Sequence, residues 1–524
     1  MSLVKKFASV GGATMASRVL GFVREALVAA ALGAGPVADA FYAAFRFPNL
    51  FRRLFAEGAF NTAFIPLFAK HVEGGGEAGA KQFAEDVLSF LLAALIVISA
   101  LAMIFMPFLV STIIAPKFAA NPEKFDITVL LTRIMFPYLL CMSLVAMLSG
   151  ILNSLRYYFL AAIVPVLLNI ILVAVLLYAI QSGADARTTG VLMAWGVFAS
   201  GFAQLAFLIH GVRKRGMSLS LQAPRWTPDV KRLLILMGPA ALTGGVTQIN
   251  LLIGQIIASA QDGAIALLNY ADRINQLPLG VIGVAIGVVL LPELSRTLKA
   301  GNNADADHLM NRSIEFGLGL TLPAAVALTV MPEPIVSLLY QRGAFTAETT
   351  HLAAQALAAF AVGLPAYVLI KVFSPGFFAR EDMKAPFWFS VIAVAINVAA
   401  SLLLFGTYGH VAIALATSIS AWVNVVLLAV VLSMRGYFHP SPATMRRSAL
   451  IIAASLAMGL ALYLLGDVFS QSYTSPAFGV RFLSTFGVIA AGFAVYFAVV
   501  IATKALDPAL LTRLVRRRQA KKPA

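Results

Sequence analysis

Residues 14–66 read TMASRVLGFVREALVAAALGAGPVADAFYAAFRFPNLFRRLFAEGAFNTAFIP, a stretch apolar enough to cross a membrane twice. It nevertheless carries eight charged side chains, which are Arg18, Arg24, Glu25, Asp39, Arg46, Arg52, Arg53 and Glu57. An arginine near the centre of a bilayer costs about 2.5 to 3.5 kcal/mol on insertion scales, so several of these side chains must face protein, water or a ligand instead of lipid. Because arginine is in excess, we expect the ligand to be an anionic substrate.

The whole chain has the composition of a membrane protein. Of its 524 residues, 60% are hydrophobic and 12% are charged, and the mean hydropathy is +0.88. Apolar runs of about 20 residues, the length that crosses a ~30 Å hydrocarbon core, recur along it. We predict an all-α polytopic protein with fourteen transmembrane helices, at approximately 8–34, 37–69, 82–114, 127–153, 159–180, 189–211, 232–260, 264–294, 313–340, 351–379, 386–405, 409–434, 446–466 and 480–503. The short connections leave no room for a catalytic domain outside the membrane.

The basic residues predict the orientation. If the N-terminus is cytoplasmic, 26 of the 39 Lys and Arg residues fall in cytoplasmic segments and only five in the opposite loops. This bias follows the positive-inside rule with both termini cytoplasmic, and it explains the net charge of +16 without any nucleic acid. The basic tail at 513–522 is expected to rest on anionic membrane lipids. The single cysteine, Cys141, excludes an intramolecular disulfide and is expected to be a small core residue.

The chain contains a weak tandem repeat. A shift of 226 residues brings Asn49 onto Asn275 and Pro66 onto Pro292, and a shift of 228 pairs Pro137 with Pro365. Each unit would hold six spans, so the two lobes would share one orientation, as in transporters that bind their substrate between lobes. We predict a six-helix lobe at 1–215, a second at 216–440 around the same central cavity, and two extra helices with the basic tail at 441–524.

In the first lobe the predicted cavity residues lie on spans one and two. Arg18, Gly21 and Arg24 fall within about a 120° sector of a helix, with Gly21 where a missing side chain lets a ligand approach the backbone. Asp39 and Arg46 share a stripe of span two. Arg52 and Arg53 are either cavity residues or an interfacial pair that extends toward the headgroups, and Arg53 could pair with Glu57. Glu25 is a further candidate.

In the second lobe the candidates lie on spans seven, eight and ten. Thr243, Thr247, Asn250 and Gly254 form a polar stripe that either lines a cavity or packs closely. Asn269, Arg273 and Gln276 share a face of span eight, with Asp272 placed to balance or orient Arg273. Lys371 either lines the cavity or extends to the interface.

At this point the residues resemble the MurJ (MviN) lipid II flippases, within the superfamily of multidrug, oligosaccharidyl-lipid and polysaccharide exporters. The resemblance runs the full length and is most specific in 17–41, 45–68, 270–296 and LYQRGAFT at 339–346. It implies a fourteen-span bacterial inner-membrane protein that moves lipid II, the undecaprenyl-diphosphate-linked cell-wall precursor, from the cytoplasmic to the periplasmic leaflet. The family's essential cavity charges match Arg18, Arg24, Asp39, Arg52 and Arg273. Spans thirteen and fourteen are associated in the family with a groove for the lipid tail.

The resemblance leaves the energy source open. Some members bind sodium in the second lobe, but those ligands do not map onto this chain, so we expect no metal site and no cofactor, with coupling to a monovalent cation or to the membrane potential. Proteins of cell-wall synthesis are candidate partners. The competing hypotheses are a multidrug or other polysaccharide-lipid exporter, a membrane glycosyltransferase and a scaffold. The exporter should use acidic ion sites, the enzyme should need carboxylates or a metal at a membrane face, and the scaffold would not explain buried arginine.

Overall fold

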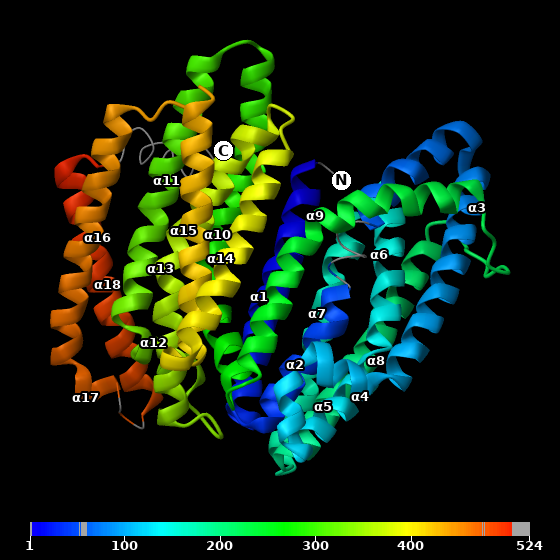
Figure 1. Cartoon of the computed structure of the whole chain (residues 1–524), viewed down its shortest axis with the longest axis horizontal. Helices are drawn as coiled ribbons and strands as arrows, with labels where there is room; N and C mark the ends of the chain where they lie inside the picture. Colours follow the sequence, from blue (N-terminus) through cyan, green and yellow to red (C-terminus); the bar gives the residue numbers. More distant parts are fainter. Residues whose placement is uncertain (1–2, 52, 54–59, 474, 476, 506–524) are drawn as a thin grey trace, which may run out of the picture. The chain divides into compact units, whose positions relative to one another are not determined.

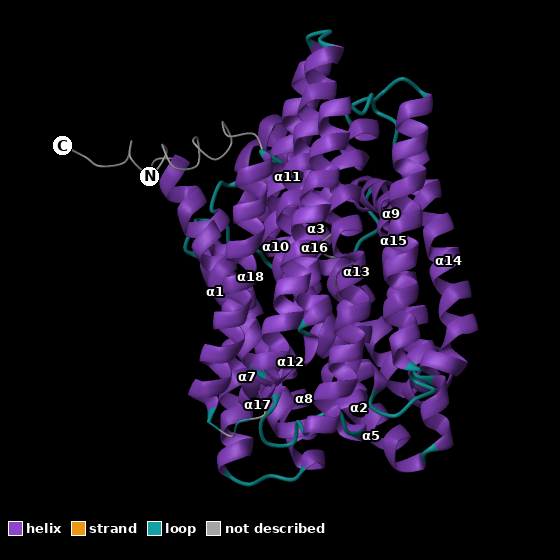
Figure 2. Cartoon of the chain, turned by 90° about the vertical axis from the view of Figure 1, so that its left-hand side faces the viewer, coloured by secondary structure: helices purple, strands orange, loops and turns teal. Residues whose placement is uncertain are grey.

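The computed structural model describes residues 3–51, 53, 60–473, 475 and 477–505, and these residues form helices and loops without a strand (Figure 2). The helices up to residue 258 are α1 (Leu3–Leu32), α2 (Pro36–Phe51), α3 (Phe60–Ile104), α4 (Met106–Leu109), η2 (Val110–Ile114), η3 (Pro116–Ala120), α5 (Pro122–Met135), α6 (Tyr138–Ser154), α7 (Tyr158–Gln181), α8 (Ala186–Arg213) and α9 (Pro228–Ala258). The remaining helices are α10 (Ala264–Lys299), α11 (Asn303–Val330), α12 (Pro332–Tyr340), α13 (Ala347–Phe378), α14 (Lys384–Tyr408), α15 (His410–Met434), α16 (Pro442–Val468), α17 (Ser470–Tyr473) and α18 (Phe478–Thr503) (Figure 1). The all-α prediction is confirmed.

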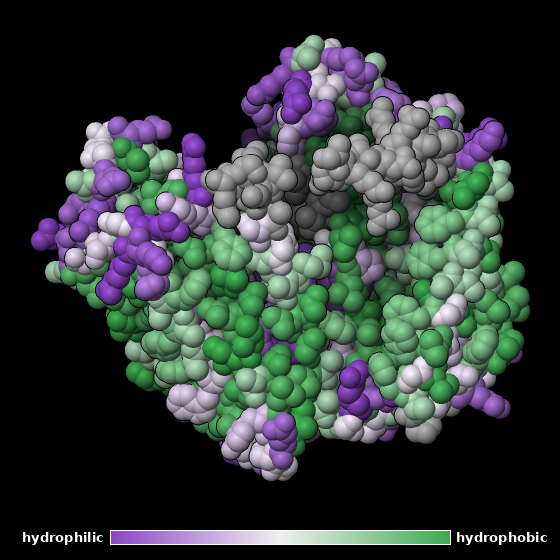
Figure 3. All heavy atoms as spheres, turned by 180° about the vertical axis from the view of Figure 1, so that it is seen from behind, coloured by the Kyte–Doolittle hydropathy of each residue, from purple (hydrophilic) through white to green (hydrophobic). Residues whose placement is uncertain are grey.

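Ten helices among the described residues are long and apolar enough to cross a membrane. They are α3, the α5–α6 pair taken together, α7, α8, α11, α13, α14, α15, α16 and α18. The prediction of a multi-pass membrane protein is therefore confirmed, and Figure 3 shows apolar side chains across the middle of one face with hydrophilic ones toward its edges. The other four predicted spans correspond to α1, α2 with the start of α3, α9 and α10, so the count of fourteen stays a prediction.

Several helices begin at a polar residue followed by proline. Asn121, Thr227 and Ser441 each accept a hydrogen bond from the backbone N–H three residues later, at 3.2, 3.2 and 3.0 Å. Such a side chain satisfies one of the unpaired donors of the first turn, and a proline in the next position loses no hydrogen bond. These Asn-Pro, Thr-Pro and Ser-Pro pairs fix the starts of α5, α9 and α16.

The chain divides into two compact units. The first comprises Met1–Ala266 together with Arg342–Thr346, and within it α1 packs on α7, α7 on α8, α2 on α5, and α3 on α6 and α9. Small residues let these helices approach. A Cβ at Gly201 of α8 would lie 3.0 Å from the Cβ of Cys141, which is buried and free, so the expectation of a small core cysteine is confirmed.

The second unit comprises Leu267–Gln341 and Ala347–Ala524, and its core lies among α10, α11, α13, α15, α16 and α18. The two helices outside the predicted repeat are packed into this core. The Tyr496 hydroxyl of α18 donates to the Gly319 carbonyl oxygen of α11 at 2.6 Å, and a Cβ at Gly492 would lie 2.5 Å from Leu462 of α16. The predicted lobe boundary at 215/216 rests on the repeat alone and stays a prediction.

Two local features differ from the predicted spans. The polar stretch 70–81, expected to be a connection, is helical within α3 except at Gly76, whose φ of 62° and ψ of −161° break the helix there. The prolines of spans nine and ten act unequally. Pro332 begins α12 after a break at Met331, whereas Pro323, Pro365 and Pro375 lie inside continuous helices.

Candidate functional site

Arg24 is held inside the first unit by two partners. One guanidinium nitrogen donates to Asn169 Oδ1 of α7 at 3.1 Å, and another to Glu25 Oε2 at 3.0 Å. The Asn169 amide donates in turn to the Ser17 carbonyl oxygen at 3.0 Å, so Asn169 links α7 to α1. The Arg24 side chain is 15% exposed. A neutral amide and one carboxylate therefore fix the direction of this guanidinium.

Glu25 links α1 to α2. Its side chain is buried, and its Oε1 accepts a hydrogen bond from the Tyr42 hydroxyl at 2.8 Å while Oε2 pairs with Arg24. A carboxylate at this depth is stable only when its oxygens are bonded and its charge is offset. In this structure Glu25 therefore orients Arg24 and does not line an open cavity.

The other two candidates of span one, Arg18 and Gly21, differ in their exposure. Arg18 is exposed, on the same side of α1 as the exposed Met15 and Val19. Gly21 is buried, so its backbone is not open to a ligand in this structure. Of the two arginines expected in this sector of α1, Arg18 is therefore exposed, and Arg24 is held by Asn169 and Glu25.

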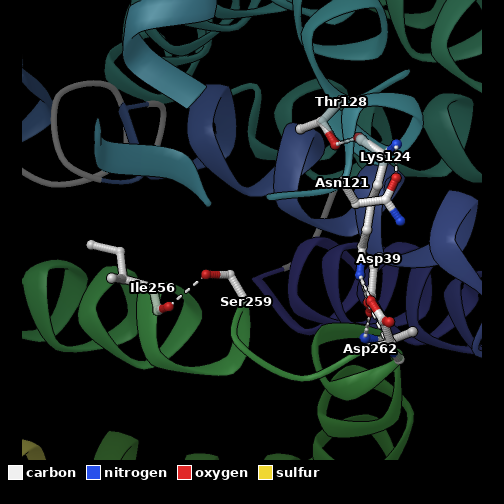
Figure 4. Close-up of polar contacts among 9 residues, drawn as sticks. Asp39, Asn121, Lys124, Thr128, Ile256, Ser259 and Asp262 are labelled. Atoms are coloured by element: carbon white, nitrogen blue, oxygen red, sulfur yellow. Dashed lines mark hydrogen bonds and ion pairs between the residues drawn. The ribbon is translucent and has the colours of Figure 1, made fainter. Parts of the chain in front are cut away.

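Asp39 lies at the centre of a buried cluster that joins α2, α5 and the first turn of α10 (Figure 4). Its carboxylate is fully buried and accepts from Lys124 Nζ at 2.7 Å and from the backbone N–H groups of Gly263 and Ala266 at 2.7 and 2.9 Å. Lys124 Nζ also contacts the exposed Asp262 carboxylate at 2.8 Å. A carboxylate on the first N–H groups of a helix is favourable there, because those donors lack partners within the helix. These bonds fix Asp39 within the protein, and its assignment as a substrate-binding residue stays a prediction.

Three arginines at the end of span two are placed unequally. Arg46 is half-buried and Arg53 is exposed. Arg52 and Glu57 lie outside the described residues. The cavity and the interfacial assignments of this group both stay predictions.

In the second unit the predicted residues of α10 lie near its start, and Gly283 further along α10 packs against α13. Asp272, Arg273 and Asn269 are half-buried, and the exposed Gln276 donates from Nε2 to Asp272 Oδ2. Further along α10, a Cβ at Gly283 would lie 2.9 Å from Lys371 Nζ of α13, so this glycine makes room for the lysine. Lys371 is half-buried against α10.

The polar stripe of α9 is described only in part. Asn250 is half-buried and Thr247 is exposed, whereas the side chain of Thr243 lies outside the description. The more informative residue of α9 is Gln255, which is buried and donates from Nε2 to the Ile114 carbonyl oxygen at 2.8 Å. Gln255 and Lys124 were missed in the sequence because each bonds to a partner more than 80 positions away.

The fold and the charged side chains bonded between its helices define a class, the polytopic helical membrane proteins. Residues 28–483 match the family model described as lipid II flippase MurJ. The chain belongs to this family.

Relatives and solved structures agree with this membership. The chain is 52% identical over 99% of its length to a probable lipid II flippase MurJ of Rhizobium tropici, covering 98% of that relative. It is 34% identical to a lipid II flippase MurJ of Burkholderia cenocepacia, with 87% and 89% of the two chains covered. A solved lipid II flippase MurJ in an inward closed conformation matches with a TM-score of 0.75 at 26% identity, covering 94% and 99% of the chains. A multidrug transporter of the MATE family matches with a TM-score of 0.66 at 15% identity over 80% and 94%, which shows the shared fold alone.

Proposed function

We propose that this protein is a flippase that moves lipid II from the cytoplasmic to the periplasmic leaflet of a bacterial inner membrane. Membership in the MurJ family, through a match that covers residues 28–483, is the observation that carries the proposal. Relatives described as lipid II flippases align over nearly the whole chain, so no large part of it is left for a different activity. The protein acts as a transporter.

The arginines suit the diphosphate of such a substrate. A disaccharide-pentapeptide headgroup does not cross hydrocarbon unaided, and a planar guanidinium can hold two phosphate oxygens at once. Arg18, Arg24, Arg52 and Arg273 are the residues we assign to this contact. Arg24 is oriented in advance by Asn169 and Glu25, and exchange of one of these bonds for a phosphate oxygen would leave its position unchanged. Asp39 supports the site through Lys124.

Transport follows from two six-helix repeats that alternate access to the site. In this proposal fourteen spans cross the membrane with both termini in the cytoplasm, and the apolar tail stays in lipid or along α16 and α18. An outward move of a negative headgroup gains about 2.3 kcal/mol per charge per 100 mV when the inside is negative. Once lipid II has left, the arginine charge of the empty site is no longer offset. The same field would then draw the site back toward the cytoplasm.

The test is the periplasmic exposure of labelled lipid II in cells that depend on this protein, read out with an externally added enzyme that cleaves the exposed headgroup. A charged hydrogen bond contributes about 1.5 to 3 kcal/mol, so we expect Arg24→Ala or Arg273→Ala to lower exposure roughly 10- to 100-fold while lipid II accumulates inside. Arg187→Ala, at the exposed start of α8, is the matched control and should leave exposure unchanged at equal protein level.

Normal exposure after depletion of the whole protein would refute the flippase function and favour a drug exporter of the same fold. If depletion of the protein reduces exposure but the arginine variants expose lipid II normally, the flippase function stands. The arginines would then not contact the diphosphate.

A further inference from the structure

An apolar crevice lies in the first unit between α3, α6 and α8. Its volume is about 290 Å³. Its helical lining is almost wholly aliphatic and consists of Leu88 and Leu92 of α3, Leu140, Leu144 and Leu148 of α6, and Leu205, Ile209 and Val212 of α8. From Leu140 to Leu148 it follows the helix for about 12 Å. Such a lining offers no partners to a sugar or a peptide and fits a hydrocarbon chain.

The mouth of the crevice is cationic. Arg213, the last residue of α8, is the one charged side chain among its lining residues, and Lys214 and Arg215 follow it directly. All three are exposed. The Arg215 guanidinium lies over the Tyr157 ring at 4.1 Å, which holds it beside the end of α8. An anionic group at this mouth would therefore meet concentrated positive charge.

The outer wall of the crevice is an ordered loop. Met217, Leu219 and Leu221 of the segment between α8 and α9 line it. The buried Glu85 of α3 fixes this segment by accepting from the Ser220 backbone N–H at 2.8 Å and from Gln222 Nε2 at 2.9 Å. One side of the crevice is thus formed by a hydrogen-bonded segment, which is the linker that joins the two predicted repeats.

We propose that this crevice binds a glycerophospholipid of the bilayer with an anionic headgroup, one acyl chain lying among the leucines and the phosphate on Arg213. The contents of a crevice among membrane-spanning helices come from the membrane, and a basic mouth selects an anionic phosphate. This inference goes beyond the transport function and does not depend on it. Because Leu219 and Leu221 form part of the wall, the bound lipid also holds the linker against α3.

The experiment measures lipid binding to the purified full-length protein in detergent by native mass spectrometry. Phosphatidylglycerol is titrated against phosphatidylcholine with the same acyl chains. We expect preferential retention of phosphatidylglycerol by the wild type, and about fivefold weaker binding by Arg213→Gln, since one basic residue at a membrane surface contributes about that factor. Arg187→Gln, at the opposite end of the same helix, should bind like the wild type.

A second variant tests binding of the acyl chain separately from binding of the phosphate. Ile209→Trp fills the crevice and should abolish retention of phosphatidylglycerol, whereas Phe202→Trp, at an exposed position on α8, should not. Equal binding of phosphatidylglycerol by Arg213→Gln and the wild type would overturn the proposal. So would displacement of phosphatidylglycerol by equimolar undecaprenyl phosphate, because the crevice would then belong to a polyprenyl tail.

Discussion

At the scale of single residues, the strongest test concerns the buried pair of Asp39 and Lys124. Replacing Asp39 with Asn keeps the size of the side chain and removes the charge that offsets Lys124, whose side chain is 1% exposed. Breaking a buried ion pair by removing one partner typically costs about 3 to 5 kcal/mol. We therefore expect Asp39→Asn to lower the midpoint of thermal unfolding in detergent strongly and to lower lipid II exposure through lost protein.

The same cluster supplies its own control. Asp262 also pairs with Lys124 but is 84% exposed, so Asp262→Asn should cost about 1 kcal/mol or less. Adding Lys124→Met to Asp39→Asn should recover part of the loss, because the buried ammonium, then offset only by the exposed Asp262, is gone. Equal unfolding midpoints for Asp39→Asn and Asp262→Asn would show that the buried pair does not stabilise this end of the first unit.

This cluster also marks the limit of sequence reasoning about the site. The charges of residues 14–66 predicted that polar side chains lie at membrane depth, and Arg24 with Asn169 fits that prediction. Lys124 was counted only as a basic residue of an outer loop. Its partner is 85 positions away in the chain, and no local spacing indicates such a pair.

At the scale of elements, the loop between α12 and α13 contacts the end of α1. Ala344 donates its backbone N–H to the Ala30 carbonyl oxygen at 2.8 Å. Gly343 has a φ of +58°, and a Cβ there would lie 2.3 Å from that same oxygen. Only glycine fits this position, because both the backbone conformation and the space exclude a side chain.

We therefore expect Gly343→Ala to lower the thermal unfolding midpoint more than the strain of a positive φ alone would, because the added Cβ also clashes with the Ala30 carbonyl oxygen. Gly183→Ala is the matched control, since Gly183 has a φ of +64° with nothing within 4 Å of the added Cβ. It should cost only the strain of a positive φ, about 1 to 2 kcal/mol. If the two variants unfold at the same temperature, the contact of Gly343 with Ala30 contributes nothing beyond backbone conformation.

The starts of helices α5, α9 and α16 show what the apolar runs could not predict. Asn-Pro, Thr-Pro and Ser-Pro caps begin these helices at 122, 228 and 442, whereas the apolar runs placed the starts at 127, 232 and 446. The stretch 70–81 was predicted as a connection because it is polar, yet a polar exposed stretch can continue a helix when only Gly76 interrupts it. The LYQRGAFT segment at 339–346 was recognisable as a motif, but its packing on α1 is a long-range contact that no spacing reveals.

At the scale of the whole molecule, the charge asymmetry predicts an orientation. With both termini in the cytoplasm, the loop between α7 and α8 is periplasmic and the linker between α8 and α9 is cytoplasmic. Lipid II would then be taken up on the side that carries most of the basic residues. The arrangement matters for the mechanism because outward movement of a negative headgroup gains energy only when the cytoplasm is the negative side.

Cysteine labelling in intact cells tests this orientation, and the chain suits it because Cys141 is its only cysteine and is buried. We expect a membrane-impermeant maleimide to label Ser182→Cys, at the exposed end of α7, without permeabilisation, and to label Ala223→Cys, on the exposed linker, only after it. Wild-type protein should stay unlabelled in intact cells, which controls for Cys141. The reverse pattern would place the basic linker outside and remove the electrical driving force from the proposed transport. Both variants keep every arginine assigned to the diphosphate, so their lipid II exposure should equal that of the wild type and link the measured orientation to the working protein.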